Sequence, residues 1–246
     1  MSVSTPEELE ALRAVGRVVA ETLRTMRRAV RAGVTTARLD EVGERVCRRA
    51  GARSGPQLDY GFPGFTCIRV NDEAVHGIPG LRRLREGDLV KLDVAAELDG
   101  FYADACVSVP VGRARPATTR LATTARVALE HGLRAARAGQ PLNAIGAAVE
   151  QTVNAHGYSV CAALLGHGIG RRIHEAPEVP SVYVPELTEQ LTVGLVLTIE
   201  PIVSAGSGDV RDAGDGWTVS TADGSTAAHA EHTIVITAGA PLVLTG

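Results

Sequence analysis

A stretch near the N-terminus recurs in the second half of the chain, and this repeat limits the folds that the chain can adopt. Residues 28–33 read RAVRAG and residues 134–139 read RAARAG, and at the same offset Gly51 falls on Gly157. In both copies the sequence predicts a helix that ends at a glycine, a short loop and a second amphipathic helix. Valine-rich extended segments follow both copies. We therefore expect two similar α+β halves, the alternative being chance similarity in a chain rich in alanine and arginine.

The segment that joins the two halves is short. Residues 112–120 read GRARPATTR, a polar linker too short for loosely tethered domains. The chain of 246 residues suffices for one large domain with a buried core. The sequence therefore predicts a single domain over residues 1–246, with halves at about 1–112 and 117–246 and a site between them.

Two aspartates lie on a β-hairpin predicted around Asp99–Gly100, because Asp-Gly between apolar runs favours a two-residue type I′ turn. With that turn, Asp93 lies opposite Cys106 and Asp104 lies opposite Ala95. The two aspartates are then diagonal neighbours on one face, about 7–8 Å apart. Two buried carboxylates repel each other, and a metal cation would offset that repulsion. The alternative is that both aspartates face solvent on an edge ribbon.

The second half offers further carboxylates. Glu200 lies within an apolar run, where Pro201 indicates an edge strand or a break in the sheet, and Glu231 begins another predicted strand. Glu200 also follows Asp93 at close to the repeat offset. Four carboxylates and a histidine such as His167 suit one or two divalent ions such as Mn²⁺, Fe²⁺, Co²⁺ or Zn²⁺. Two ions held together would activate a water between them.

Two histidines occur in the segment LGHGIGRRIHEAP. His167 and His174 are seven residues apart, and the glycines between them and Pro177 argue against a helix. In a regular strand an odd spacing turns the two rings to opposite faces. They need not share a metal, although a bend at Gly168 or Gly170 could bring both to one cavity.

Composition excludes several classes of protein. A net charge of −3 gives no general attraction to nucleic acid or membranes, and no apolar run reaches the roughly 18 residues of a membrane span. The acidic N-terminus lacks the order of a secretion signal, so we expect a cytoplasmic protein. The four cysteines form no close pair, which argues against a structural zinc site and a disulfide framework: Cys47, Cys67, Cys106 and Cys161.

Six segments occur in the order found in methionine aminopeptidases: NDEAVHGIP, LDVAAELDGFYAD, GHGIGRRIHEAP, TIEP, DGWTV and EHTIVIT. The chain resembles the short bacterial form of type I, within metallopeptidase family M24. The resemblance implies the α+β pita-bread (creatinase/aminopeptidase) fold, in which two pseudo-symmetric halves of helices pack on a curved antiparallel sheet. It implies a catalytic domain that removes the initiator methionine from nascent proteins and peptides with a small second residue. We expect a monomer, without sequence-specific nucleic-acid binding; contact with the ribosome stays open.

The resemblance also implies two divalent metal ions per chain, Co²⁺, Mn²⁺, Fe²⁺ or Zn²⁺. Asp93 would chelate one ion, and Asp104 and Glu231 would bridge both. His167 and Glu200 would complete the second ion, and Glu200 would also act as general base and acid for the bridging water.

Two further histidines take catalytic positions by the same resemblance. His76 would contact the scissile amide near its nitrogen. Without the resemblance, a single histidine at this position would be interpreted as an ordinary loop residue. His174 would donate to the carbonyl oxygen of the substrate and so to the tetrahedral intermediate. Both residues are therefore expected to bind substrate and to act in catalysis.

A methionine pocket is implied as well, lined by Phe62, Cys67 and Trp217. Taken alone, Trp217 could equally be an ordinary core residue. Asp59 stands where a tyrosine is common; we expect it to point to solvent, the alternative being that Tyr60 takes that place. Ile173 replaces a common phenylalanine, and His229 stands where a polar amide is common and receives no role.

Three other classes of protein compete with this interpretation. Proline-directed peptidases and creatinases share the fold, but they usually carry a large additional N-terminal domain. A binding module derived from the family would have lost ligands, and none of the five ligand positions is changed here. A mononuclear iron oxygenase would use two histidines and one carboxylate.

Overall fold

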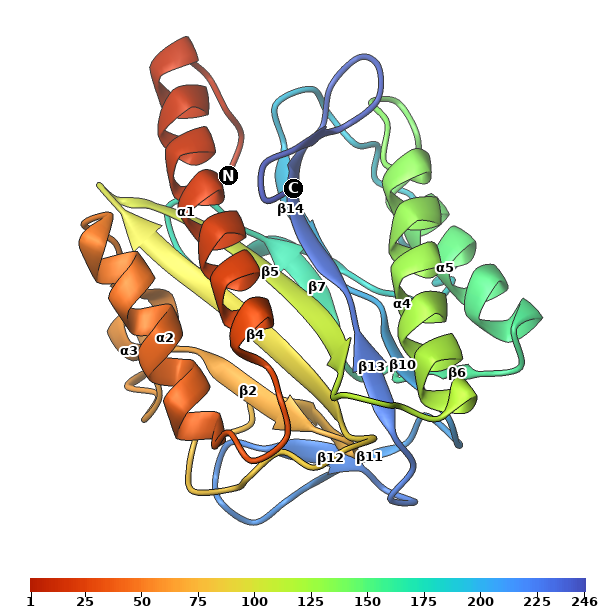
Figure 1. The fold of residues 1–246 in the computed structure, drawn as a ribbon. Helices are drawn as coiled ribbons and strands as arrows, with labels where there is room; N and C mark the ends of the chain where they lie inside the picture. Colours follow the sequence, from red (N-terminus) through yellow and green to blue (C-terminus); the bar gives the residue numbers. More distant parts are fainter.

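The computed structural model describes residues 1–246. Two pairs of helices stand side by side against one face of a large sheet, with a short helix near its end (Figure 1). Thr5 caps the first helix by accepting a hydrogen bond from the Glu8 backbone N–H, as its Ser/Thr-Pro-Glu start favours. The helices are α1 (Pro6–Ala29), α2 (Thr36–Arg49), α3 (Gly55–Tyr60), α4 (Pro116–Ala135) and α5 (Asn143–Ala155).

The helix pairs follow the sequence repeat. Helix α1 ends at Ala29 and α4 at Ala135, which are equivalent positions at the repeat offset, so the prediction that each of these helices ends at a glycine is wrong. The loops that follow pass through Gly33 and Gly139, whose φ angles are 86° and 81°, a region open mainly to glycine. The repeated sequence thus produces the same helix–glycine–helix geometry twice.

The strands form one nine-stranded sheet and two sheets of three strands, and all of their pairings are antiparallel. The large sheet has the order β1-β4-β5-β14-β9-β7-β8, with β2 on β4 and β15 on β14, and the small sheets have the orders β13-β10-β6 and β11-β12-β3. The strands are β1 (Arg53–Ser54), β2 (Cys67–Val70), β3 (Glu73–Val75), β4 (Leu89–Leu98), β5 (Phe101–Pro110), β6 (Ser159–Val160), β7 (Gly166–Gly168), β8 (Glu175–Val179), β9 (Val196–Ile199), β10 (Ile202–Ser204), β11 (Val210–Asp212), β12 (Val219–Thr221), β13 (Ala227–His229), β14 (Glu231–Val235) and β15 (Leu242–Val243).

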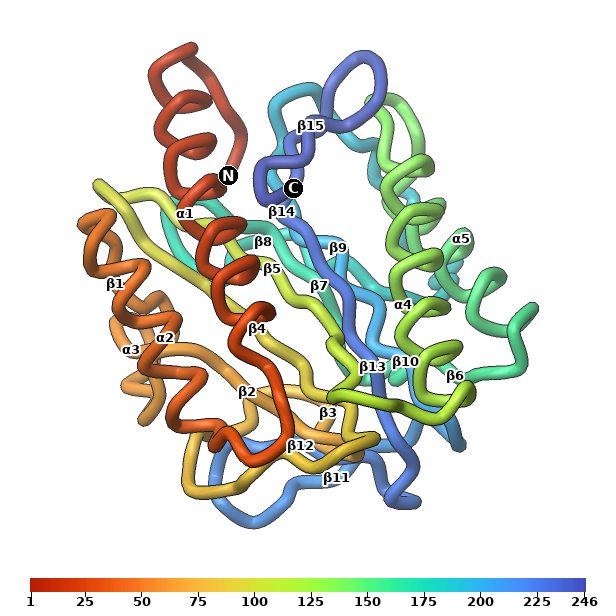
Figure 2. The backbone as a smooth tube through the Cα atoms, viewed as in Figure 1, coloured from red at the N-terminus to blue at the C-terminus, as the bar shows by residue number.

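The large sheet is continuous across both halves of the chain. Strand β14 from the second half lies between β5 of the first half and β9, as the course of the chain shows (Figure 2). One apolar cluster packs α1 and α2 against β4 and β5, and a second packs α4 and α5 against β9 and β14. The helices therefore cover one face of the sheet, and the opposite face at the β5–β14 junction is left for the site.

The predicted hairpin is confirmed. Asp99 and Gly100 have φ angles of 51° and 81°, and β4 pairs with β5 so that Asp93 lies opposite Cys106 and Asp104 opposite Ala95. Neither aspartate lies on a solvent-facing edge, because β4 and β5 are interior strands of the sheet. The Asp-Gly turn therefore sets which side chains share a face.

The predicted interruption at Pro201 is a break rather than an edge strand. Strand β9 ends at Ile199, and the chain resumes as β10, which belongs to a different sheet. Strand β9 itself is interior, between β14 and β7. Proline cannot continue the hydrogen-bond ladder, so Glu200 lies outside the strand. Its side chain lines the cavity of the site.

Candidate active site

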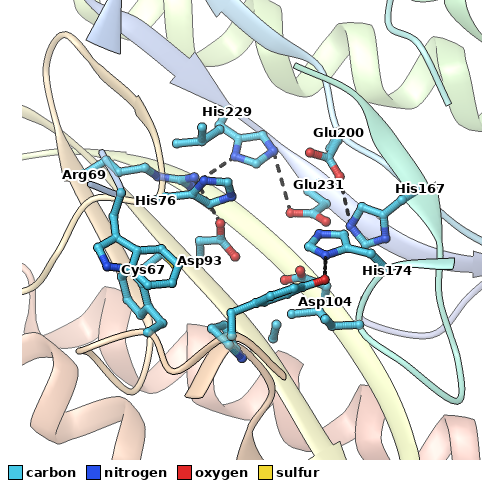
Figure 3. Close-up of a pocket in the computed structure, with 17 residues that line it drawn as sticks. Cys67, Arg69, His76, Asp93, Asp104, His167, His174, Glu200, His229 and Glu231 are labelled. Atoms are coloured by element: carbon cyan, nitrogen blue, oxygen red, sulfur yellow. Dashed lines mark hydrogen bonds and ion pairs between the residues drawn. The ribbon is translucent and has the colours of Figure 1, made fainter. Parts of the chain in front are cut away.

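One cavity of about 370 Å³ gathers every site residue that the sequence predicts. Its walls come from β2, β4 and β5 of the first half and from β7, β14 and the β9–β10 junction of the second (Figure 3). The predicted residues that line it are Tyr60, Phe62, Cys67, His76, Asp93, Asp104, His167, His174, Glu200, Trp217 and Glu231. Residues far apart in the sequence thus meet where the two halves join.

The carboxylates form the floor of this cavity. Asp104, Glu200 and Glu231 are 8%, 9% and 2% exposed. Asp104 Oδ1 and Glu231 Oε1 are buried without any hydrogen-bond partner, a costly state for a carboxylate oxygen. Ligand atoms of Asp104, His167 and Glu231 all lie within 4.8 Å of one another. Converging oxygens without partners, beside a histidine nitrogen, fit a divalent cation.

Burial and mutual repulsion act on the same carboxyls. Burial, and then Asp93 and Glu200, raise the pKa of Asp104 well above its usual value. Burial, and then Asp104 and Glu200, do the same to the pKa of Glu231, and burial raises the pKa of Glu200 to about 8. A bound cation would favour the ionised forms of all three.

His167 is held as a neutral ring. Glycines on both sides let neighbouring strands come close, since a side chain at Gly166 or Gly168 would meet backbone carbonyl atoms. The His167 Nδ1 lies 2.9 Å from the Gly168 carbonyl oxygen, to which it can only donate, so Nε2 keeps its lone pair. That Nε2 lies 3.6 Å from Glu200 Oε2. Burial lowers the pKa of His167 to about 3, so the ring is neutral at physiological pH.

The two histidines of the glycine-rich segment meet in space. The register of β7 with β8 shifts after His167, and Gly170 has a φ angle of 148°. This bend overrides the opposite facing of a regular strand, and the rings of His167 and His174 lie 4.2 Å apart, edge to face. The Tyr60 hydroxyl lies 2.6 Å from His174 Nδ1. If that hydroxyl donates, His174 carries its proton on Nε2.

His76 follows β3 in a left-handed backbone conformation, with a φ angle of 55°. Such a conformation is uncommon for a histidine and is maintained by the surrounding structure. Here β3 pairs with β12, and the His76 carbonyl accepts a long hydrogen bond of 3.5 Å from the Thr218 hydroxyl. The His76 ring lines the cavity beside Asp93 (Figure 3).

An apolar corner adjoins the carboxylates. Phe62 is 3% exposed and meets Trp217 edge to face with ring centroids 5.2 Å apart, so Trp217 contacts the cavity rather than only the core. Cys67 and Ile173, both buried, also line the cavity. The corner can hold an unbranched apolar side chain.

Asp59 does not line the cavity, and the expectation that it simply points to solvent needs correction. Although exposed, its carboxylate accepts hydrogen bonds from the Tyr102 hydroxyl at 2.8 Å and from the Ile173 backbone N–H at 3.2 Å. Its neighbour Tyr60 lines the cavity instead. Asp59 therefore anchors the backbone just before His174.

Sequence reasoning missed one functional neighbour. Arg69 on β2 is fully buried, and its Nη1 lies 3.0 Å from Asp93 Oδ2. The available signal was its spacing, because Arg69 is two residues from Cys67 and so shares its face of the strand. Arg69 also lies 3.0 Å from His229, the residue that received no role.

The raised pKa of Glu200 predicts a pH dependence for the metal-free protein. A carboxyl whose pKa rises from 4.5 to about 8 on folding stabilises the fold fully below pH 4.5, and this stability is lost as the pH rises through 8. We expect the free energy of unfolding to fall by about 1 kcal/mol from pH 7 to 8.5. Urea unfolding in EDTA measures this free energy at each pH. Added Mn²⁺ should remove its decline with pH. A free energy of unfolding that increases with pH in EDTA would contradict the prediction.

Residues 10–238 match the sequence profile of "Metallopeptidase family M24". The chain belongs to this family. Methionine aminopeptidase 2 of Bacillus subtilis (strain 168) is 42% identical to it over 247 residues, which cover 100% of this chain and 99% of the relative. The crystal structure of methionine aminopeptidase from Rickettsia prowazekii superposes with a TM-score of 0.96 at 34% identity and covers 100% of both chains. The predicted family and pita-bread fold are confirmed.

A solved structure named for a different activity shares only the fold with this chain. Prolidase from Pyrococcus furiosus superposes with a TM-score of 0.80 at 20% identity and covers 99% of this chain but 65% of the prolidase. This likeness concerns architecture alone. None of the helices in this M24 chain has the length and apolar character needed to cross a membrane.

Proposed function

We propose that this M24 metallopeptidase removes the N-terminal methionine from proteins and peptides whose second residue is small. One observation carries the proposal: a buried group of carboxylates and histidines shares a single cavity with an apolar corner formed by Phe62, Cys67 and Trp217. The corner suits a thioether side chain, which is long, unbranched and polarisable. Its place beside the carboxylates puts the scissile bond of a terminal methionine at the reactive end of the cavity.

Two divalent ions, of a kind such as Co²⁺, Mn²⁺, Fe²⁺ or Zn²⁺, would be held by the five ligands that the family resemblance assigns. Asp93 would hold one ion, His167 and Glu200 the other, and Asp104 and Glu231 both. The unpartnered oxygens of Asp104 and Glu231 support the bridging assignment, because each of these carboxylates has an oxygen to spare. When bound, the ions would lower the pKa of water and supply a nucleophile near neutral pH.

The side chains of this chain would perform the remaining steps. Glu200 would take a proton from the attacking water and later pass one to the leaving amine. His174 would donate from Nε2 to the carbonyl oxygen as negative charge develops there, with Tyr60 fixing the ring through Nδ1. His76 would contact the amide near its nitrogen. Phe62 and Trp217 would hold the methionine so that these groups meet a single peptide bond.

The biological setting follows from this substrate. An initiator methionine is first exposed on a newly made chain, so nascent proteins in the cytoplasm are the expected substrates. Catalysis by one copy is expected, because all of the site residues come from a single chain. The preference for a small second residue is what the resemblance to methionine aminopeptidases implies.

Peptide hydrolysis tests the proposal. The purified protein with Mn²⁺ or Co²⁺ is expected to release methionine from Met-Ala-Ser, and neither to cleave Met-Leu-Ser at a comparable rate nor to cleave Ala-Pro. Chromatography of the products measures each rate. Cleavage of Ala-Pro would favour a proline-directed peptidase. No release from any of the peptides, together with metal analysis of an empty site, would overturn the proposed function.

A further inference from the structure

The Arg69 guanidinium lies directly behind the proposed metal centre. Its Nη1 lies 3.0 Å from Asp93 Oδ2 and its Nη2 lies 3.0 Å from His229 Nδ1 (Figure 3). Nη2 also donates to Cys106 Sγ at 2.9 Å. The Arg69 side chain has no exposed area, and a buried arginine is rarely found without such partners. Three strands supply the contacts, since Cys106 belongs to β5, Asp93 to β4 and His229 to β13.

The surroundings of the guanidinium are themselves a set of potential metal ligands. Ligand atoms of Asp93, Cys106 and His229 lie within 4.8 Å of one another. Arg69 contacts all three residues, through Asp93 Oδ2, Cys106 Sγ and His229 Nδ1, so its positive charge lies beside the groups that could otherwise hold an ion. The Asp93 carboxylate is therefore shared between a fixed cation behind it and the cavity in front.

The contact with Arg69 limits how strongly the Asp93 carboxylate can bind a metal ion. Oδ2 of Asp93 lies in an ion pair with Arg69 Nη1, which has no hydrogen-bond partner, so the arginine acts on this carboxylate through its charge. The usual support for a metal ligand is a carboxylate, a carbonyl or a water, which leaves the ligand's charge available to the ion. A buried guanidinium instead neutralises part of that charge and repels a divalent ion nearby.

Arg69 also reaches a second proposed ligand through His229. An arginine can only donate, so His229 Nδ1 accepts from Nη2 and the ring proton lies on Nε2. That Nε2 lies 3.6 Å from Glu231 Oε2. The position of Arg69 therefore determines the His229 tautomer, and with it the direction in which a proton faces Glu231.

We propose that Arg69 is a positioning residue that weakens binding of the divalent ion held by Asp93, by partly neutralising the charge of the Asp93 carboxylate and by fixing His229 against Glu231. The inference rests on the proposed metal centre. Arg69 reaches the ion held by His167 and Glu200 only indirectly, through His229 and Glu231, so the binding of that ion should be less affected. Arg69 would thus set the difference in affinity between the two positions.

Calorimetric titration of metal-stripped full-length protein with Mn²⁺ tests this role. Arg69→Met removes the positive charge beside Asp93, so we expect the second Mn²⁺ to bind about tenfold more tightly, with less change in the first. Electron paramagnetic resonance should then detect coupled Mn²⁺ pairs at lower total Mn²⁺ than in the unmodified protein. Circular dichroism checks that the variant is folded.

Two further variants keep the test decisive. Arg69→Gln, whose neutral amide can still bond Cys106 or His229, should shift the second dissociation constant in the same direction if Arg69→Met does not fold. Lys91→Met is the matched control: Lys91 is a buried cation opposite Arg69, but its Nζ donates to the Asn71 carbonyl at 2.7 Å. It should leave the second dissociation constant within about twofold.

The outcomes separate this inference from the proposed function. An unchanged or weaker second Mn²⁺ in folded Arg69→Met or Arg69→Gln would overturn the role of Arg69, even if the unmodified protein cleaves Met-Ala-Ser. An equal gain in affinity for the second Mn²⁺ in Lys91→Met would overturn it as well, because removal of any buried positive charge would then account for the effect. Absence of any Mn²⁺ binding by the unmodified protein would overturn the metal centre itself.

Discussion

Replacing His174 with alanine is expected to lower kcat by roughly 10²–10³-fold while the metal content stays near that of the unmodified protein. His174 Nδ1 shares a hydrogen bond with the Tyr60 hydroxyl, and His174 is more exposed than His167. It does not belong to the close group of ligand atoms formed by Asp104, His167 and Glu231. Its loss should therefore remove a donor to the developing oxyanion and leave the ligands in place.

His167→Ala is the matched comparison, because the two rings lie 4.2 Å apart in the same cavity. His167 is buried, its Nδ1 is engaged with the Gly168 carbonyl, and its Nε2 faces the carboxylates. This variant should lose one metal ion per chain. Metal analysis by mass spectrometry, with kcat and KM measured on Met-Ala-Ser, distinguishes the two roles. Equal loss of metal from both variants would refute the division.

The part of the site that the sequence could predict is the part determined by local rules. An Asp-Gly turn has few alternatives, so it determined the register of β4 and β5 and the shared face of Asp93 and Asp104. Gly51 and Gly157, which follow the second helix of each repeat, likewise adopt the left-handed geometry expected at a helix end. These features depend only on residues near one another in the chain.

The parts that the sequence left open depend on contacts between distant segments. Whether His167 and His174 converge is decided by a register shift against β8, and periodicity alone favoured opposite faces. Asp59 looked solvent-facing because its partners, Tyr102 and the Ile173 N–H, lie far away in the sequence. Arg69 escaped notice because an arginine in a short apolar strand is usually exposed, and only the fold brings its buried partners together.

Glu200→Gln is expected to reduce kcat by on the order of 10²–10⁴-fold, the usual contribution of a general base. Glutamine has nearly the same shape and keeps one carbonyl oxygen for a metal ion, but it cannot accept a proton from water. In the structure Glu200 is positioned from both sides, since Oε2 accepts a hydrogen bond from Thr198 Oγ1 at 2.8 Å and faces His167 Nε2. The variant should therefore retain most of its metal while losing most of its rate.

The pH profile separates this role from a purely structural one. If Glu200 is the base, the rise of kcat/KM on the acidic side should flatten in Glu200→Gln, because the group that must lose a proton is gone. Glu189→Gln is a suitable control: Glu189 is an exposed acid in the second half of the chain and does not line the cavity. It should keep its rate and its profile. The prediction is contradicted if Glu200→Gln keeps its full metal content, a near-normal kcat and an unchanged acidic limb of the pH profile. Another group would then transfer the proton, and Glu200 would act only as a metal ligand.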